Sequence, residues 1–228
     1  MRHPYKKVTE RIIAELESSS WPSWSSYTAQ HNKLQVSKAR DARIDEFLAS
    51  TGARIRESDV ADNAYYDRFA DLITIPTFLR ERCGQAEYIN TLFHELIHWS
   101  AHSTRLNRSF DDDPRAHLIE ELIAEFGAAY LCAQFSVTGY VPHVIYIRNQ
   151  LELFDDPSTV FIAVSKAQAA VDFLQQLMRT CQREICARYS TSCLRKNELS
   201  RAEKKAHAKL LHVNPSLISH VRKGRTWA

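Results

Sequence analysis

Residues 94–98, with the sequence His-Glu-Leu-Ile-His, have the residue types and the spacing of a metal-dependent hydrolase. Two histidines four positions apart on a helix point the same way, so both imidazoles can bind one metal ion. A glutamate between them is close enough to polarise a water molecule beside that ion. The pattern predicts that His94 and His98 bind one Zn²⁺ ion and that Glu95 is the general base.

The helix expected to carry these residues runs from Tyr88 to Trp99. At 3.6 residues per turn, apolar side chains cover somewhat over half of its circumference, and the remaining polar strip contains no Lys or Arg. A solvated helix face normally carries such charges. The strip therefore favours a functional site, with a surface helix that carries two spare histidines as the alternative.

Catalytic zinc usually has three protein ligands and one open position, so a third ligand must come from elsewhere. In the metzincin pattern the third histidine would fall at Thr104, which excludes that subclass. His102 continues the polar strip, but it would lie roughly 12 Å from His94 along the helix axis, too far to share one ion. We expect His102 to be near the ligands, to face the substrate or to be simply exposed.

A second helix, predicted from Pro114 to Cys132, offers the missing ligand. Three aspartates precede Pro114, which is typical of a helix start. Glu121 and Glu125 lie one turn apart in a stripe with small residues, which suits close approach by another helix. We predict that Glu121 is the third ligand and that Glu125 orients a ligand histidine. Glu120, about 100° away around the axis, is the reserve candidate, and a solvated acidic face is the alternative.

Further segments accompany these motifs in a consistent order. They are Ala64–Tyr66, Asp71–Pro76, Tyr88–Trp99, Arg105–Arg108, Glu120–Glu125 and Ala163–Phe173. The stretch that contains them, from Ala64 to Leu174, is about half of the chain. It resembles the zincin-like metallopeptidase domain of ArdC-type antirestriction proteins, which is found in plasmid and phage polyvalent proteins. The resemblance implies an α+β fold that is mostly helical, in which a small antiparallel or mixed sheet accompanies the HExxH helix and the glutamate-bearing helix.

The N-terminal region resembles the opening of that family's single-stranded-DNA-binding domain over residues 5–24. The chain before Ala64 is too short for the rest of that domain, so single-strand binding does not carry over. We expect a remnant with an amphipathic helix and a second helix near residues 43–48. The apolar face of the first is predicted to consist of Val8, Ile12, Ile13 and Leu16. Trp21, Trp24 and Tyr27 have the chemistry to stack bases, but core packing is the preferred interpretation.

Composition narrows the remaining possibilities. No apolar run is long enough to span a bilayer, and no secretory signal opens the chain. Five cysteines with scattered spacing argue against a disulfide framework and favour a reducing, cytoplasmic location. Cys181, Cys186, Cys193 and His207 match no common zinc finger, so a second zinc site is not expected.

The C-terminal segment differs in charge from the rest of the chain. Residues 1–187 carry 20 basic and 25 acidic side chains, whereas residues 188–228 carry 10 basic and 2 acidic ones. A helix over residues 202–211, a turn and a helix from Pro215 to Arg222 resemble the helix-turn-helix of mobile-element proteins. The predicted DNA-contacting residues are Ser216, Ser219, His220, Arg222, Lys223 and Arg225. A helical hairpin that packs on the main domain is the alternative.

These observations predict three regions: an N-terminal remnant (1–50), a metallopeptidase domain (51–187) and a basic tail (188–228). In the proposed reaction Glu95 transfers a proton to the leaving amine, and Tyr66 or Tyr65 donates to the developing oxyanion. The segment 71–76 is expected to be an edge strand that pairs with an extended peptide.

Two functions remain open. The first is a zinc metallopeptidase that acts on a protein or peptide and is brought to DNA by its tail, in antirestriction or mobile-element biology. The second is a non-catalytic DNA-binding or antirestriction factor in which metal only stabilises the fold. A remnant whose function decayed with the missing N-terminal domain is a third possibility. The sequence does not indicate the oligomeric state.

Overall fold

A computed structural model describes residues 3–17, 38–108, 113–137, 147 and 159–188. Its elements belong to two units. One unit contains α1 (His3–Glu17), the three strands, η1 (Leu79–Cys83), α4 (Gln85–Ser100), α5 (Pro114–Phe135) and α7 (Thr159–Arg188) as far as Asp172. The other contains α3 (Lys38–Thr51) and α7 from Phe173 onward. The division at residues 50 and 187 stays a prediction, and the expected helix-turn-helix lies outside the described residues.

The sheet has three strands in the order β1-β3-β2. They are β1 (Arg54–Ser58), β2 (Tyr65–Asp67) and β3 (Leu72–Pro76). β1 pairs with β3 in parallel, and β2 pairs with it antiparallel, so the sheet is mixed. The prediction that residues 71–76 form an edge strand was wrong, because β3 is central. Its last four residues are all buried, which is the environment of a strand with neighbours on both sides.

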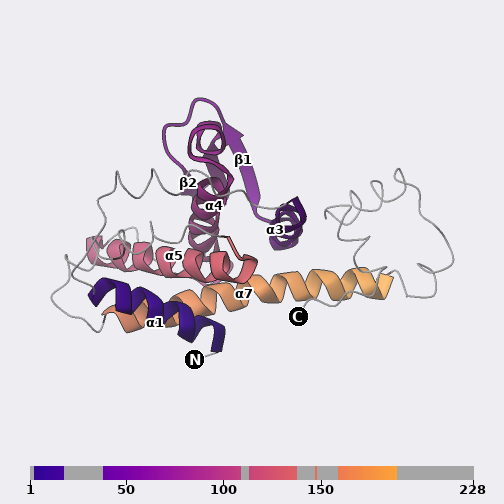
Figure 1. Ribbon diagram of the computed structural model, residues 1–228. Coiled ribbons are helices and arrows are strands. Elements are labelled where there is room, and N and C mark those ends of the chain that lie inside the picture. The colour runs from indigo at the N-terminus through magenta and orange to yellow at the C-terminus, as the bar shows by residue number, and fades with distance from the viewer. Residues whose placement is uncertain (1–2, 18–37, 109–112, 138–146, 148–158, 189–228) are drawn as a thin grey trace. The chain divides into compact units, whose positions relative to one another are not determined.

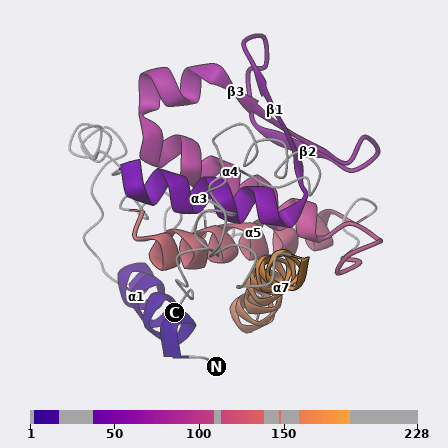
Figure 2. The ribbon, with the colours of Figure 1, turned by 90° about the vertical axis from the view of Figure 1, so that its right-hand side faces the viewer.

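Helix α4 packs between the sheet and α5, and α1 packs against α5 on the side away from α4 (Figures 1 and 2). Gly127 lies at the crossing of α4 and α5. A Cβ atom at this position would lie 2.6 Å from Ile97 Cδ1, so a larger residue would require the Ile97 side chain to move. A buried hydrogen bond of 2.7 Å from Cys132 Sγ to Asn90 Oδ1 links the same two helices. The fold confirms the expected α+β class, mostly helical with a small mixed sheet.

The helix that carries the acidic residues begins where the sequence predicted. Asp113 caps it, because its carboxylate accepts a hydrogen bond of 2.9 Å from the Arg115 backbone N–H, and Pro114 follows at a position that needs no donor. The helix ends at Phe135, where Ser136 adopts a left-handed conformation with φ 54°. The start of α5 therefore places Glu120 and Glu121 in its second turn.

Helix α1 turns a wider face to the core than the predicted apolar one. Of the four predicted residues Ile12 is buried and Val8, Ile13 and Leu16 are half-buried, while Tyr5 and Thr9 are buried as well. Thr9 Oγ1 lies 2.7 Å from the hydroxyl of Tyr130, and the Tyr5 hydroxyl donates to Asp172 over 2.9 Å. Two side chains with polar groups that find partners in the fold thus extend the predicted apolar stripe.

Trp21, Trp24 and Tyr27 lie outside the described residues. Within the described part of the chain, none of the helices has the length and apolar character that crossing a bilayer requires.

Candidate metal centre

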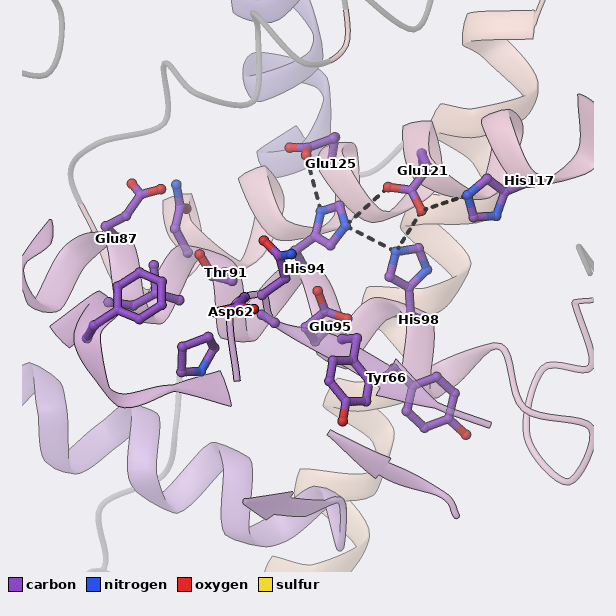
Figure 3. A pocket seen from close by; sticks show the side chains of 17 residues that line it. Asp62, Tyr66, Glu87, Thr91, His94, Glu95, His98, His117, Glu121 and Glu125 are labelled. Atoms are coloured by element: carbon purple, nitrogen blue, oxygen red, sulfur yellow. Dashed lines mark hydrogen bonds and ion pairs between the residues drawn. The ribbon is translucent and has the colours of Figure 1, made fainter. Parts of the chain in front are cut away.

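Three side chains from two helices converge on one point. His94 and His98 lie one turn apart on α4, and Glu121 faces them from α5 (Figure 3). The two histidine Nε2 atoms are 3.1 Å apart. Glu121 Oε2 is 3.4 Å from His94 Nε2, and Glu121 Oε1 is 3.3 Å from His98 Nε2. The crossing of α4 and α5 thus brings together the three side chains that the sequence singled out as ligands.

These separations fit a tetrahedral metal ion. Ligand atoms that lie about 2.0–2.1 Å from such an ion are about 3.3 Å from one another. The Nε2–Nε2 distance and the distance from each Nε2 to the nearer Glu121 oxygen, a different oxygen for each histidine, are close to this value. In the described part of the chain, this is the group of His, Cys, Asp and Glu side chains whose donor atoms come close enough to hold an ion, all within 4.8 Å. The donor set of two imidazoles and one carboxylate also matches the ligand types that catalytic zinc prefers.

Each histidine is held from behind by a further carboxylate of α5. Glu125 Oε1 lies 3.2 Å from His94 Nδ1, and Glu120 Oε1 lies 3.3 Å from His98 Nδ1. An ionised carboxylate only accepts hydrogen bonds, so in the neutral imidazole Nδ1 carries the proton and Nε2 keeps its lone pair for a metal. Glu125 therefore lies where an orienting residue would be needed, and Glu120 lies behind His98 rather than beside Glu121.

The charges of this cluster shift its acid–base properties. Burial alone would lower the pKa of His98, but its hydrogen bonds to Glu120 and Glu121 raise the pKa to about 9. Burial opposes the same shift at His94, where Glu125 and Glu121 raise the pKa well above its ordinary value. Burial would raise the pKa of Glu121, yet the two histidines hold it far below its usual range. The surrounding carboxylates thus favour positive charge on the two imidazoles, as they would favour a bound cation.

A cavity of about 700 Å³ opens beside the cluster. The carboxylate of Glu95 lines it, next to both histidines (Figure 3), and its side chain is 7% exposed. The cavity walls contain five carboxylates and, among the lining residues, no Lys or Arg. Such a lining favours a bound cation, and Glu95 stands where a base could take a proton from water in the cavity.

Tyr66 and Tyr65 line the same cavity from β2. The Tyr66 hydroxyl donates to Asp71 Oδ1 over 2.8 Å and accepts from Arg105 Nη2 over 2.9 Å. Burial and the hydrogen bond to Asp71 raise the pKa of Tyr66 well above its ordinary value. The Tyr66 proton is therefore engaged, whereas Tyr65 is 46% exposed. Either tyrosine as the oxyanion donor stays a prediction.

Two other histidines lie near this region. His102 follows the end of α4, and its Nδ1 lies 2.8 Å from Thr104 Oγ1; it is not among the residues that line the cavity. His117 does line the cavity, with its Nε2 3.8 Å from Glu121 Oε1. Sequence reasoning missed His117, although its position four residues before Glu121 on the same helix was a usable signal.

Comparison with protein families matches this chain to the zincin-like metallopeptidase model over residues 42–166. Among curated proteins, the chain is 32% identical over 162 residues to the uncharacterized protein y4eC of Sinorhizobium fredii (strain NBRC 101917 / NGR234), covering 69% of this chain and 52% of that protein. It is also 31% identical over 138 residues to a DNA primase TraC of Escherichia coli, covering 58% of this chain and 13% of that protein. The chain thus spans at most about half the length of these relatives.

Solved structures give the same assignment. The antirestriction protein ArdC of the R388 plasmid, in its Mn(II)-bound form, is similar with a TM-score of 0.53 and 36% sequence identity over 64% of this chain and 55% of that one. Its metal-free form has a TM-score of 0.52 and 33% identity over 71% of this chain and 57% of that one. The fold is therefore zincin-like, and the Mn(II) ion of that relative together with the site geometry implies a divalent metal.

Proposed function

Since the chain belongs to the zincin-like metallopeptidase family, we propose that it is a zinc-dependent peptidase of the ArdC type that hydrolyses a protein or peptide. The observation that carries the proposal is the convergence of His94, His98 and Glu121, whose donor atoms lie within 4.8 Å of one another at the wall of an open cavity. A purely structural site would be expected to enclose its ion with a fourth protein ligand, whereas a catalytic site keeps one position open.

When bound by these three side chains, the metal ion would act as a Lewis acid toward water and the scissile carbonyl. Glu95 accepts the proton of the attacking water and passes it to the leaving amine. Tyr65 or Tyr66 donates a hydrogen bond to the oxyanion. In the described sheet β2 is an edge strand, and its residues Tyr65 and Tyr66 line the cavity, so we propose that an extended peptide pairs with its outer edge.

Glu95→Gln tests the catalytic part of this proposal. We expect the variant to bind Zn²⁺ as the wild type does but to lose peptide-bond hydrolysis, because an amide cannot accept the proton. The measurement is the release of new amino termini from a denatured protein mixture, with metal content determined in parallel. Equal turnover by the variant would refute Glu95 as the base. A zinc-loaded wild type that releases none would favour the non-catalytic scaffold.

The biological setting is the second part of the proposal. The solved relative is an antirestriction protein of a plasmid, and TraC is a DNA primase. We infer that this chain also acts in antirestriction or in another process of mobile genetic elements. Its basic tail would bring it to DNA, through Ser216, Ser219, His220, Arg222, Lys223 and Arg225.

A gel-shift assay compares the full chain with a variant in which Arg222, Lys223 and Arg225 are replaced by Ala. We expect the variant to bind DNA more weakly and with a smaller dependence on salt, because three phosphate-pairing cations are lost. Equal affinity of the two proteins would exclude the tail as the DNA contact.

A further inference from the structure

Residues 101–108 form a loop directly after α4, called here the α4 C-terminal loop. Its backbone folds back on the helix end: Leu106 N–H donates to Ser100 O over 3.1 Å, and Arg108 N–H donates to Ala101 O over 2.9 Å. The loop thereby satisfies carbonyl groups of the last helical turn, which would otherwise lack intrahelical partners. It also fixes the backbone beside His98, which lies in that turn.

Arg108, the last residue of this loop, turns its guanidinium back beneath α4. It donates to Glu120 through two nitrogens, Nε to Oε2 and Nη2 to Oε1, both over 2.8 Å. It also donates to Ile97 O over 2.9 Å and to Ser100 Oγ over 3.1 Å. Two parallel bonds to one carboxylate fix its plane as well as its position. The orientation of Glu120 is therefore set by a residue from the other helix's loop.

Glu120 passes this orientation on to His98. Its Oε1 accepts from Arg108 and also lies 3.3 Å from His98 Nδ1. The side chains of Glu120 and Arg108 are only 2% and 9% exposed, so solvent cannot replace these bonds. Arg108 thus contacts Glu120, and Glu120 contacts His98. The Nε2 atom on the other side of the His98 ring faces Glu121.

We propose that Arg108 is a positioning residue of the metal centre: acting through Glu120, it fixes the ring of His98 so that Nε2 points at the metal position. This inference rests on the proposed function, because it requires a metal at His94, His98 and Glu121. Partners behind a ligand histidine typically change metal affinity by about 10- to 100-fold when they are removed.

Hydrogen bonds set the orientation of the Arg108–Glu120 pair. Although both side chains are almost fully buried, they line a second cavity of about 420 Å³, whose wall includes Ile119, Ile123 and Lys166. On the side of this cavity, packing alone does not fix the direction of the guanidinium. A residue of equal length without donors would therefore leave Glu120 and the His98 ring free to reorient.

Arg105 provides a matched control within the same loop. Its side chain is 10% exposed, and it too donates to an α4 carbonyl, that of Trp99, over 2.6 Å. Its guanidinium pairs with Asp71 on the sheet side instead of with a carboxylate behind a histidine. Replacing Arg105 thus disturbs the loop to a similar degree without touching the contacts of His98.

The test compares full-length wild type, Arg108→Met and Arg105→Met by chelator competition for Zn²⁺, with the visible spectrum of bound Co²⁺ as a readout of ligand geometry. We expect Arg108→Met to weaken Zn²⁺ binding about 10- to 100-fold and to alter the Co²⁺ spectrum. Arg105→Met should keep both within about threefold of the wild type.

Arg108→Met leaves the Glu120 carboxylate buried without its guanidinium and could therefore misfold. A second variant controls for this outcome. Arg108→Met combined with Glu120→Gln removes that charge, and we expect it to fold but still to bind Zn²⁺ more weakly than the wild type. Wild-type affinity in the folded double variant, or equal loss in Arg105→Met, would overturn the inference and leave the proposed function standing. Zn²⁺ binding that survives replacement of His94 and His98 by Ala would overturn both this inference and the proposed function.

Discussion

At the scale of single residues, the candidate metal centre contains three glutamates of one helix in different positions. Glu121 faces the two Nε2 atoms, whereas Glu120 and Glu125 stand behind the Nδ1 atoms of His98 and His94. A glutamate at the ligand position contributes a bond to the ion itself, while one behind a histidine only sets the direction of the imidazole lone pair. The same substitution should therefore have effects of different size at these positions.

Replacing Glu125 with Gln should weaken Zn²⁺ binding about 10- to 100-fold, because a neutral amide holds the His94 ring less firmly than a carboxylate. Glu121→Gln should cost more, since it removes a charged ligand. Glu87→Gln, which changes a carboxylate of the same cavity that lies nearly two turns before His94, serves as the control and should bind as the wild type does. Dissociation constants from chelator competition check this order. An equal loss in all three variants would point to the overall charge of the cavity instead of to orientation.

The sequence predicted the convergence of His94, His98 and Glu121 because helical periodicity places these residues on definite faces. It did not predict the part played by Arg108 and left Glu120 only as a reserve ligand. The Arg108–Glu120 and Glu120–His98 contacts depend on how α4 crosses α5 and on where the loop after α4 returns. Neither contact follows from spacing along the chain. Two glutamates about 100° apart on α5 both reach α4 because His98 lies between them at the crossing.

At the scale of elements, the distance between α4 and α5 decides whether the ligands meet. Gly127 lies where α5 contacts α4, and Ile97 occupies the space that a Cβ atom would need. The sequence indicated close approach through the small residues near Glu125, and in the structure both Cys132 and Gly127 contact α4. The alternation of β3 was misread as that of an edge strand because a pattern of period two does not reveal how many neighbours a strand has.

Gly127→Ala should destabilise the protein by about 1–3 kcal/mol, because the added methyl group overpacks the helix crossing and outweighs the gain in helix propensity. Ile97→Ala alone should also destabilise it, by about 2–5 kcal/mol, through the cavity it leaves. The double variant should lose less than the sum of the two, since the new methyl group refills part of the space. Urea denaturation of the four proteins measures this coupling, and simple additivity would contradict the contact.

At the scale of the whole molecule, metal binding and folding are coupled through the protonation of the cluster. In the metal-free protein the surrounding carboxylates raise the pKa of both histidines, and a proton on Nε2 must leave before that atom can bind a cation. Proton and metal thus compete for the same buried site. Because a bound metal stabilises only the folded state, the benefit of metal should grow as the pH rises and the competing protons are lost.

This competition has a definite sign for His98, whose pKa rises from 6.5 to about 9 in the metal-free fold. A group with a raised pKa contributes its stability fully below pH 6.5 and loses it as the pH rises through about 9. The metal-free protein should therefore lose on the order of 3 kcal/mol across this window from His98, while the zinc-loaded protein, whose ligand histidines carry no proton on Nε2, should not. Urea midpoints at pH 6 to 9, with chelator and with excess Zn²⁺, measure both curves. His98→Asn should flatten the curve of metal-free stability against pH, and the control His102→Asn should leave it unchanged. A metal-free stability that increases with pH would contradict the coupling.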